Sequence, residues 1–217
     1  LWAPDAILVG IELGGPGAAQ HDCRRDGEHW IPTRALEPGE RYRFVVDGTA
    51  VPDPRSRRQP DGVHGASAWI PPGPVAEHRS VVHERSLARS VTYELHIGTF
   101  SPAGTFVGAI EQLDHLVDLG VTHVEVMPVA AFDGRFGWGY DGVDLFAPHP
   151  AYGSEADLHA LVAACHDRGL AVLVDVVLNH LGPSGNRLGT CGPYFTDRYH
   201  TPWGDAVNLD GPGSDGV

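Results

Sequence analysis

The first third of the chain alternates short apolar runs with turn-forming residues. The runs AILVGIEL, HWI and RYRFVV are rich in β-branched and aromatic residues, and glycine-rich or polar stretches separate them. Short strands bounded by turn signals are typical of antiparallel sheets. The pattern therefore predicts a small β-sandwich, Ig-like in architecture, over residues 1–72. The following stretch, PPGPVAEHRSVVHERSLARS, begins with prolines and carries mixed charge, which predicts a linker over residues 73–90.

After this linker the spacing of apolar residues switches between two periods. VTYELHIG, VTHVEVMPV and AVLVDVVL are strand-like, whereas the segments between them follow the helical period. Four apolar residues of VGAIEQLDHLVDLG are expected to share one helix face: Ile110, Leu113, Leu116 and Val117. A second helix is predicted in SEADLHALVAACHDRG.

The second predicted helix has clear end signals. Ser154 and Asp157 can form a capping box at its start, and Gly169 is a stop signal. An order of strand, helix, strand, helix, strand with nearly continuous apolar strands indicates a parallel sheet covered by helices. A doubly wound sheet would need a glycine-rich phosphate-binding turn after its first strand, and HIGTFSPAGTF does not have that pattern. We therefore predict the first part of an α/β (β/α)8 TIM barrel, about three βα units, over residues 91–217.

Polar and aromatic residues gather where these strands end. His96 lies late in the first strand, the aromatic loop FGWGYDGVDLF follows the second, and DVVLNH ends the third. In a (β/α)8 barrel, functional groups collect at the carboxyl ends of the strands. Asp175 stands inside an apolar run, where a carboxylate without a partner costs several kcal/mol. This residue is therefore expected either to be hydrogen-bonded at a strand end or to take part in chemistry there.

Composition narrows the classes of partner. The formal net charge of -13 argues against a nucleic-acid partner or an anionic membrane. Because the chain has no Lys, a P-loop lysine and a lysine Schiff base are excluded. The histidines show no recognisable metal-ligand spacing, so neither a metal nor another cofactor is expected.

Cysteine usage and hydropathy bear on location. The three cysteines are odd in number and never form a CxxC pair, which favours a reducing cytoplasm. No apolar stretch approaches the roughly 18 residues of a membrane span, and no signal peptide opens the chain. We expect a soluble cytoplasmic protein. The chain starts in what looks like the middle of a strand, so we also expect it to be a piece of a longer protein.

An ordered set of motifs resembles the α-amylase family of glycoside hydrolases. YELHIGTF resembles the first barrel strand of that family, GWGYDGVDLFAPHPAYGS its second βα loop, and DVVLNH the first of its four short signature regions. The resemblance covers nearly the whole chain and is firmest over residues 91–217. It implies a retaining glycosidase that acts on α-1,4-glucans, with an amino-terminal domain resembling carbohydrate-binding modules.

The resemblance also implies roles for particular residues. The expected substrate-binding residues are Tyr140, His180 and Trp138, and the expected supporting residues are Asp175, Asn179, Asp141 and His96. Tyr140 would be an aromatic platform under the sugar at the cleaved bond, and His180 would bind that sugar's hydroxymethyl group. Asp175 would be a buried partner that orients the catalytic groups, and Asn179 would support the loop.

The catalytic carboxylates of the family follow its fourth, fifth and seventh strands. They are expected beyond Val217, so this chain is expected to hold none of them. PDPRSRRQPDGVHG, HLGPSGN and TPWGDAVNLDGPGSD resemble those family members that release trehalose from malto-oligosyl trehalose, which makes this oligosaccharide the expected substrate. Two alternatives stay open: a debranching enzyme of the same family, and a non-catalytic carbohydrate-binding module.

Overall fold

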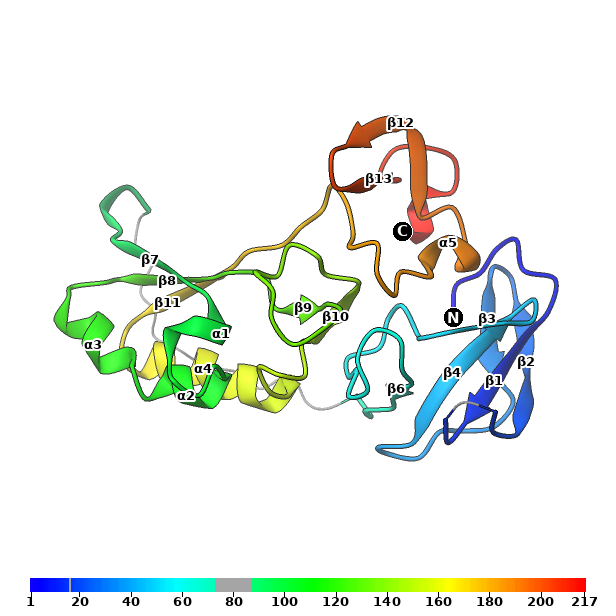
Figure 1. Cartoon of the computed structure of the whole chain (residues 1–217), viewed down its shortest axis with the longest axis horizontal. Coiled ribbons are helices and arrows are strands. Elements are labelled where there is room, and N and C mark those ends of the chain that lie inside the picture. Colours follow the sequence, from blue (N-terminus) through cyan, green and yellow to red (C-terminus); the bar gives the residue numbers. More distant parts are fainter. Residues whose placement is uncertain (16, 73–86) are drawn as a thin grey trace.

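The computed structural model describes residues 1–15, 17–72 and 87–217 (Figure 1). Most of the linker predicted at residues 73–90 lies outside the described residues. Its last part forms a short 3-10 helix, η1 (Leu87–Arg89), just before the first strand of the second half.

The amino-terminal part is a six-stranded antiparallel sheet. Its strands are β1 (Val9–Leu13), β2 (Gln20–Asp26), β3 (His29–Pro32), β4 (Arg41–Val46), β5 (Thr49–Val51) and β6 (Ser67–Ala68). The path runs β3-β2-β1-β4-β5, and β6 pairs with β4. Asp47 and Gly48 both have positive φ, as a two-residue hairpin turn between β4 and β5 requires. The predicted antiparallel strands are confirmed.

The two-sheet Ig-like sandwich is not confirmed. Within the described residues the amino-terminal strands form one sheet. Its buried side chains, including Val9 and Phe44, share a core with Leu188 and Tyr194 from the far end of the chain. A distant segment therefore covers apolar surface that a second sheet would cover in a sandwich.

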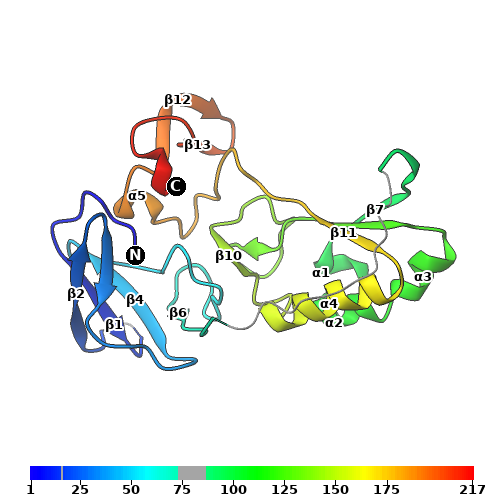
Figure 2. The same cartoon turned by 180° about the vertical axis from the view of Figure 1, so that it is seen from behind.

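The second half begins with a parallel sheet, as predicted. β7 (Thr92–Leu95), β8 (His123–Val126) and β11 (Ala171–Val174) pair in the order β11-β8-β7, and both pairings are parallel. Four helices lie along one side of this sheet in both Figure 1 and Figure 2: α1 (Ile97–Phe100), α2 (Phe106–Ile110), α3 (Leu113–Asp118) and α4 (Glu155–Asp167). This is the helix-covered parallel sheet that the alternating periodicity indicates.

The first predicted helix differs in detail. It is divided into α2 and α3 by a turn at residues 111–112. Leu113 and Leu116 are fully buried, but Val117 is 42% exposed. Val117 lies in α3 together with Leu113 and Leu116, so its exposure shows that the described residues do not cover its edge of the face. α4 begins with the predicted capping box, in which Ser154 and Asp157 bond reciprocally.

The third predicted strand is shorter than its apolar run. β11 ends at Val174, and Val176 and Leu178 beyond it are 62% and 61% exposed. Residues 175–187 instead cross from the parallel sheet to the elements above the amino-terminal sheet (Figure 2).

The remaining elements connect the two halves. β9 (Ala130–Ala131) and β10 (Asp144–Pro148) form an antiparallel pair between β8 and α4. After the crossing segment come α5 (Leu188–Cys191), β12 (Phe195–Thr201), β13 (Gly204–Val207) and the 3-10 helix η2 (Ser214–Gly216). They bring the two chain ends to the same region, where Trp2 packs edge-on against Tyr194 with ring centroids 5.4 Å apart.

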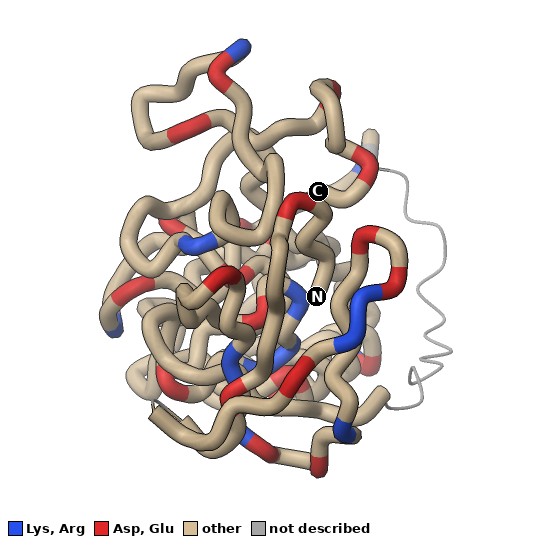
Figure 3. The backbone as a smooth tube through the Cα atoms, turned by 90° about the vertical axis from the view of Figure 1, so that its right-hand side faces the viewer, with Lys and Arg blue, Asp and Glu red and all other residues tan. Residues whose placement is uncertain are grey.

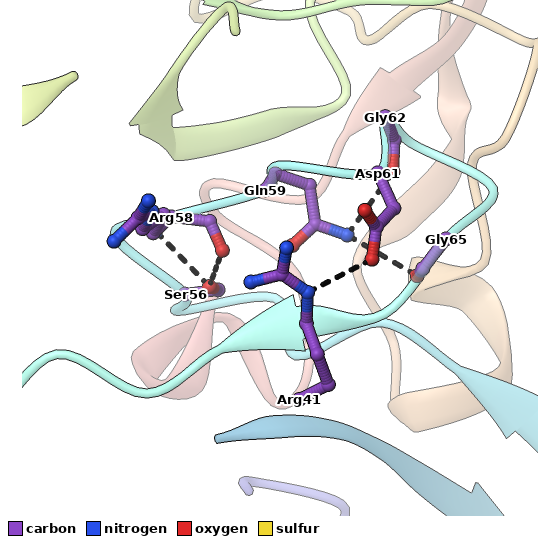
Figure 4. Close-up of polar contacts among 7 residues, drawn as sticks. All are labelled: Arg41, Ser56, Arg58, Gln59, Asp61, Gly62 and Gly65. Carbon is purple, nitrogen blue, oxygen red and sulfur yellow. Dashed lines mark hydrogen bonds and ion pairs between the residues drawn. The ribbon is translucent and has the colours of Figure 1, made fainter. Parts of the chain in front are cut away.

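The loop after β5 is organised by its own polar groups (Figure 4). Arg41 Nε donates to Asp61 Oδ2 at 3.0 Å, and the buried Gln59 donates through Nε2 to the carbonyls of Gly62 and Gly65.

The same loop also contacts the second half of the chain. Arg57 pairs with Glu155 at the start of α4, with N and O 3.4 Å apart. Val63 is buried in a small cluster with Ala131 and Val143 of the β9–β10 region. The loop after β5 therefore packs against the segment that carries the aromatic motif.

Candidate functional site

The aromatic loop and the end of β11 meet through Tyr140 and Asp175. The Tyr140 hydroxyl donates to Asp175 Oδ2 at 3.2 Å. Gly139 has a φ of 91°, and a Cβ there would collide with the carbonyl of Pro128, so the turn before Tyr140 needs glycine. Partial burial, and then the Asp175 carboxylate, raise the pKa of Tyr140, which therefore stays protonated as the donor of this bond.

Asp175 lies at the end of β11, where it is partly accessible among the described residues. It is half-buried, and its N–H donates to the Val126 carbonyl at 2.9 Å, which extends the β11–β8 pairing by one residue. Glu94 and Glu125 are directly opposite one another in the parallel sheet and lie on the same face as Asp175. The described residues leave this face open, and that is why the carboxylate stays in contact with solvent.

His180 and Asn179 are adjacent as the motif requires, with their side chains joined. His180 is 6% exposed, and its Nδ1 lies 3.2 Å from Asn179 Oδ1. Its ring stacks against Trp203, with centroids 5.4 Å apart and planes 29° apart. Trp203 is 64% exposed. Sequence reasoning gave Trp203 no role, although the TPWG motif that contains it was already noted.

His96 holds the aromatic loop through hydrogen bonds. Its Nε2 is 2.8 Å from the Gly137 carbonyl and 2.9 Å from the Tyr152 hydroxyl, and its Nδ1 is 3.1 Å from Thr99 Oγ1. A neutral imidazole with the proton on Nε2 satisfies these contacts, because Nδ1 can accept from threonine. The Trp138 ring packs against the His96 ring, with centroids 4.9 Å apart.

Asp141 contributes its backbone, rather than its side chain, to the contact between the two loops of the site region. A Cβ on Gly182 would collide with the Asp141 carbonyl, and Gly182 N–H donates to the Gly142 carbonyl at 3.0 Å. The loop after DVVLNH therefore lies directly against the aromatic loop. The structure thus joins the seven predicted residues in pairs: Tyr140 with Asp175, His180 with Asn179, and His96 with Trp138, with Asp141 at the loop contact.

Two buried titratable residues were missed. Asp144 is 5% exposed, its Oδ2 has no hydrogen-bond partner among the described residues, and burial followed by the nearby Asp53 raises its pKa to about 7. His149 is fully buried and stacks on Phe132 at 3.8 Å, and its burial lowers its pKa to about 4. Both lie inside the motif GWGYDGVDLFAPHPAYGS, but sequence reasoning gave neither a role, because their burial depends on segments that meet only in the fold.

Two negative findings concern the described part of the chain. It contains no group of three or more His, Cys, Asp or Glu side chains placed to hold a metal ion, and the expectation of a metal-free site stays a prediction. None of its helices has both the length and the hydropathy needed to cross a bilayer.

Comparison with known proteins gives a consistent result. The family model for the alpha-amylase catalytic domain matches residues 59–188. Malto-oligosyltrehalose trehalohydrolase of Mycobacterium tuberculosis (strain ATCC 25618 / H37Rv) is 48% identical over 223 residues, which cover all of this chain and 38% of that protein. The chain therefore spans well under half the length of this curated relative.

Two solved structures have folds similar to that of this chain. The crystal structure of a Salmonella typhimurium protein matches with a TM-score of 0.88 and 42% identity, covering 99% of this chain and 37% of that one. A pullulanase from Bacillus acidopullulyticus matches with a TM-score of 0.80 at 22% identity, covering 100% of this chain and 34% of that one, which shows a shared fold alone. With the family model matching more than half of its residues, the chain belongs to the α-amylase family.

Proposed function

We propose that the full-length protein hydrolyses the α-1,4 bond that releases trehalose from malto-oligosyl trehalose. The observation that carries this proposal is the 48% identity to the mycobacterial trehalohydrolase across the whole chain. The debranching alternative has weaker support, because the pullulanase likeness is at 22% identity. A binding module without catalysis remains the alternative from a different class.

The proposal includes a complete fold. Residues 1–72 would be the Ig-like sandwich domain, residues 73–90 the linker, and residues 91–217 the start of a (β/α)8 barrel. Three parallel strands with helices on one side support the barrel, since this is how such a barrel begins. The nucleophile and the acid/base would lie beyond Val217, about 5 to 5.5 Å apart across the cleaved bond, as retention requires.

The site residues would divide the work of holding one sugar ring. Tyr140 would offer an aromatic face to the pyranose at the cleaved bond, and its bond to Asp175 would fix the angle of that face. His180 would bind the hydroxymethyl group, with the Trp203 ring holding the imidazole in place. Trp138 would supply a second aromatic contact.

The charge pattern suits a neutral ligand. In Figure 3 the arginine positions are interspersed with acidic ones along the described chain, which favours an uncharged oligosaccharide over nucleic acid or a membrane surface. The three cysteines are buried thiols without disulfides, and this supports a cytoplasmic location.

A product assay tests the function. The full-length protein is incubated with maltotriosyl trehalose, maltopentaose and an α-1,6-branched glucan at equal concentration, and the products are separated by chromatography. We expect free trehalose from the first substrate to appear much faster than products of the other two, because paired polar groups discriminate strongly between sugars. Preferred cleavage of the branch would favour the debranching enzyme, and no cleavage of any substrate would favour the binding module.

A further inference from the structure

Three polar side chains from three separate loops meet outside the candidate site. His64 lies in the loop after β5, Asp133 at the start of the aromatic loop, and Ser184 in the loop that follows DVVLNH. The Ser184 hydroxyl donates to Asp133 Oδ2 at 2.6 Å. His64 Nε2 lies 3.3 Å from Asp133 Oδ1 and 3.4 Å from Ser184 Oγ. We call these three residues the loop junction.

The hydrogen bonds of the loop junction differ from those of a catalytic triad. In a triad the serine gives its proton to the histidine, whereas Ser184 donates to the carboxylate at the shorter distance. The hydrogen bond from Ser184, and then the nearby His64, hold the pKa of Asp133 below its usual range, so this carboxylate is a poor base. Asp133 therefore serves as an acceptor that brings two donors together.

Close apolar packing accompanies these polar contacts. Gly185 has a φ of 81°, and a Cβ there would collide with Val63, so the loop after DVVLNH lies directly against the loop after β5. Val63 is buried in one cluster with Ala131 and Val143. The Val143 N–H donates to the Ala131 carbonyl at 2.8 Å, which closes the aromatic loop at its base. The same three loops are thus joined by both apolar and polar contacts.

The loop after DVVLNH contacts the aromatic loop at both of its ends. The loop junction joins it to the start of the aromatic loop, and the bond from the Gly182 N–H to the Gly142 carbonyl, at 3.0 Å, joins it to the end. Tyr140 precedes Gly142 by two residues, and His180 precedes Gly182 by two. One contact alone would let the loops pivot, so both are needed to fix the Tyr140 ring relative to His180.

We propose that Asp133, together with His64 and Ser184, is a positioning residue that holds Tyr140 and His180 in place for the same sugar ring. This inference rests on the proposed function, because it assumes that the sugar is an α-glucan cleaved at this site. None of the three residues needs to touch the sugar. Their contribution comes from geometry, since a displacement of about 1 Å in an active site can cost on the order of 100-fold in rate.

Steady-state kinetics on the full-length protein tests the proposal. Asp133→Ala should lower kcat for trehalose release from maltotriosyl trehalose about tenfold, with KM within twofold, because sugar units away from the cleaved bond still bind. Asp133→Asn keeps an oxygen that can accept from Ser184, so it should keep at least half of the wild-type kcat.

A double variant separates positioning from a general loss of folded protein. If Asp133 acts mainly through Tyr140, Asp133→Ala should lower kcat by threefold or less in a protein that already carries Tyr140→Ala. A smaller folded fraction would instead lower kcat by the same factor in both backgrounds. Equal factors would therefore refute the positioning role.

Asp210→Ala is the matched control. Asp210 accepts from the Tyr199 hydroxyl at 2.7 Å and pairs with Arg198, with N and O 3.1 Å apart, so it has the same kinds of partner as Asp133. The side chains of Asp210 and Asp133 are 46% and 49% exposed. Asp210 lies outside the loops that meet at the loop junction, so kcat and KM should match the wild type.

Hydrogen exchange keeps this inference separate from the proposed function. Asp133→Ala should speed amide exchange in residues 134–142 and 181–187 of the full-length protein and leave β1 and β4 unchanged. Trehalose release by the wild type, with unchanged kcat in Asp133→Ala, would refute the positioning role and leave the proposed function intact. A wild type that releases no trehalose would refute the proposed function. Faster exchange in both loops would then still support the loop junction, and unchanged exchange would refute it.

Discussion

At the scale of single residues, Tyr140 is the side chain whose position says most about the site. It is 41% exposed, so its ring can still meet a ligand, while its hydroxyl is tied to Asp175. A group that is both oriented and accessible is what a sugar platform needs, and the prediction made from the WGYD motif can be tested on that basis.

In the full-length enzyme, Tyr140→Ala should lower kcat/KM by an amount equivalent to about 1–3 kcal/mol, because the stacking surface is lost. Tyr140→Phe keeps the ring and should lose only about 0.5–1.5 kcal/mol, the usual net value of one hydrogen bond. Steady-state kinetics on malto-oligosyl trehalose would measure both.

Tyr199→Phe is the control for this pair. Tyr199 likewise donates to a carboxylate, Asp210, at 2.7 Å, but it lies on β12 away from the aromatic loop. Its kinetics should match the wild type. Wild-type values in Tyr140→Ala would mean that the site has been misplaced.

A second residue-scale prediction concerns Asp144. Its pKa in the folded protein is about 7, against an ordinary value of 3.8, so the folded state holds a proton that the unfolded state releases between these two values. Stability should therefore fall as pH rises from about 4 to 7 and then level off. The nearby carboxylate of Asp53, which accepts from the Tyr42 hydroxyl at 2.6 Å, adds to the cost of the charged form.

Asp144→Asn should remove this pH dependence. Denaturant unfolding should show the variant increasingly more stable than the wild type as pH rises from 4 to 7. The difference should reach on the order of a few kcal/mol, since each unit of pKa shift corresponds to about 1.4 kcal/mol. Asp5→Asn, at an exposed carboxylate, serves as the control. A stability difference that does not change with pH would contradict the prediction.

At the scale of elements, the helix α4 shows how local sequence and packing combine. The predicted capping box is present, with the Ser154 hydroxyl accepting from the Asp157 N–H and the Asp157 carboxylate accepting from the Ser154 N–H at 2.8 Å. Leu161 and Cys165 are fully buried on its inner face. Capping fixes where the helix starts, and these apolar contacts fix which side faces the sheet.

Ser154→Ala should destabilise the protein by about 1 kcal/mol, the usual cost of removing a helix N-cap. The carboxylate of Asp157 accepts hydrogen bonds from the side chain and the backbone of Ser154, and these bonds hold its pKa below its usual range. Part of that stabilisation should therefore be lost on acidification, as the pH falls through the lowered pKa. Thermal unfolding would measure both effects, with Ser154→Thr, which keeps the capping hydroxyl, as the control. An unchanged midpoint would mean that tertiary contacts alone hold the start of α4.

At the scale of the whole molecule, the two sheets differ in how well they are covered. The amino-terminal sheet shares a buried core with the segment from Leu181 to Tyr194. The parallel sheet is covered by helices on one side, and Leu173 and Val174 of its edge strand β11 are 38% and 48% exposed. Exposed apolar edges lower local stability and favour association.

The isolated 217-residue chain should therefore be stable in its amino-terminal half and labile in the rest. Hydrogen exchange should show protected amides in β1 and β4 and faster exchange across β7, β8 and β11. We also expect no glycosidase activity from this chain, because the catalytic carboxylates are expected beyond Val217. Uniform protection would contradict the first expectation, and measurable turnover the second.

Local sequence determined much of this protein. The alternation of apolar periods was enough to predict the parallel sheet, and Ser154 with Asp157 was enough to predict where α4 starts. Both could be predicted because propensity and capping act over a few residues. The family followed from short motifs such as DVVLNH, whose residues are neighbours in the chain. The seven candidate site residues were all named from such motifs, and their roles remain proposals.

Tertiary structure decided what depends on segments distant in sequence. The stacking of Trp203 on His180, the partial exposure of Asp175 and the burial of Asp144 beside Asp53 each depend on which segments meet. The same holds for Val117, which the described residues leave partly exposed although Leu113 and Leu116 of the same helix are fully buried. Burial and contact are properties of pairs of surfaces, whereas periodicity describes one segment at a time, and this is the physical reason why the sequence alone could not supply them.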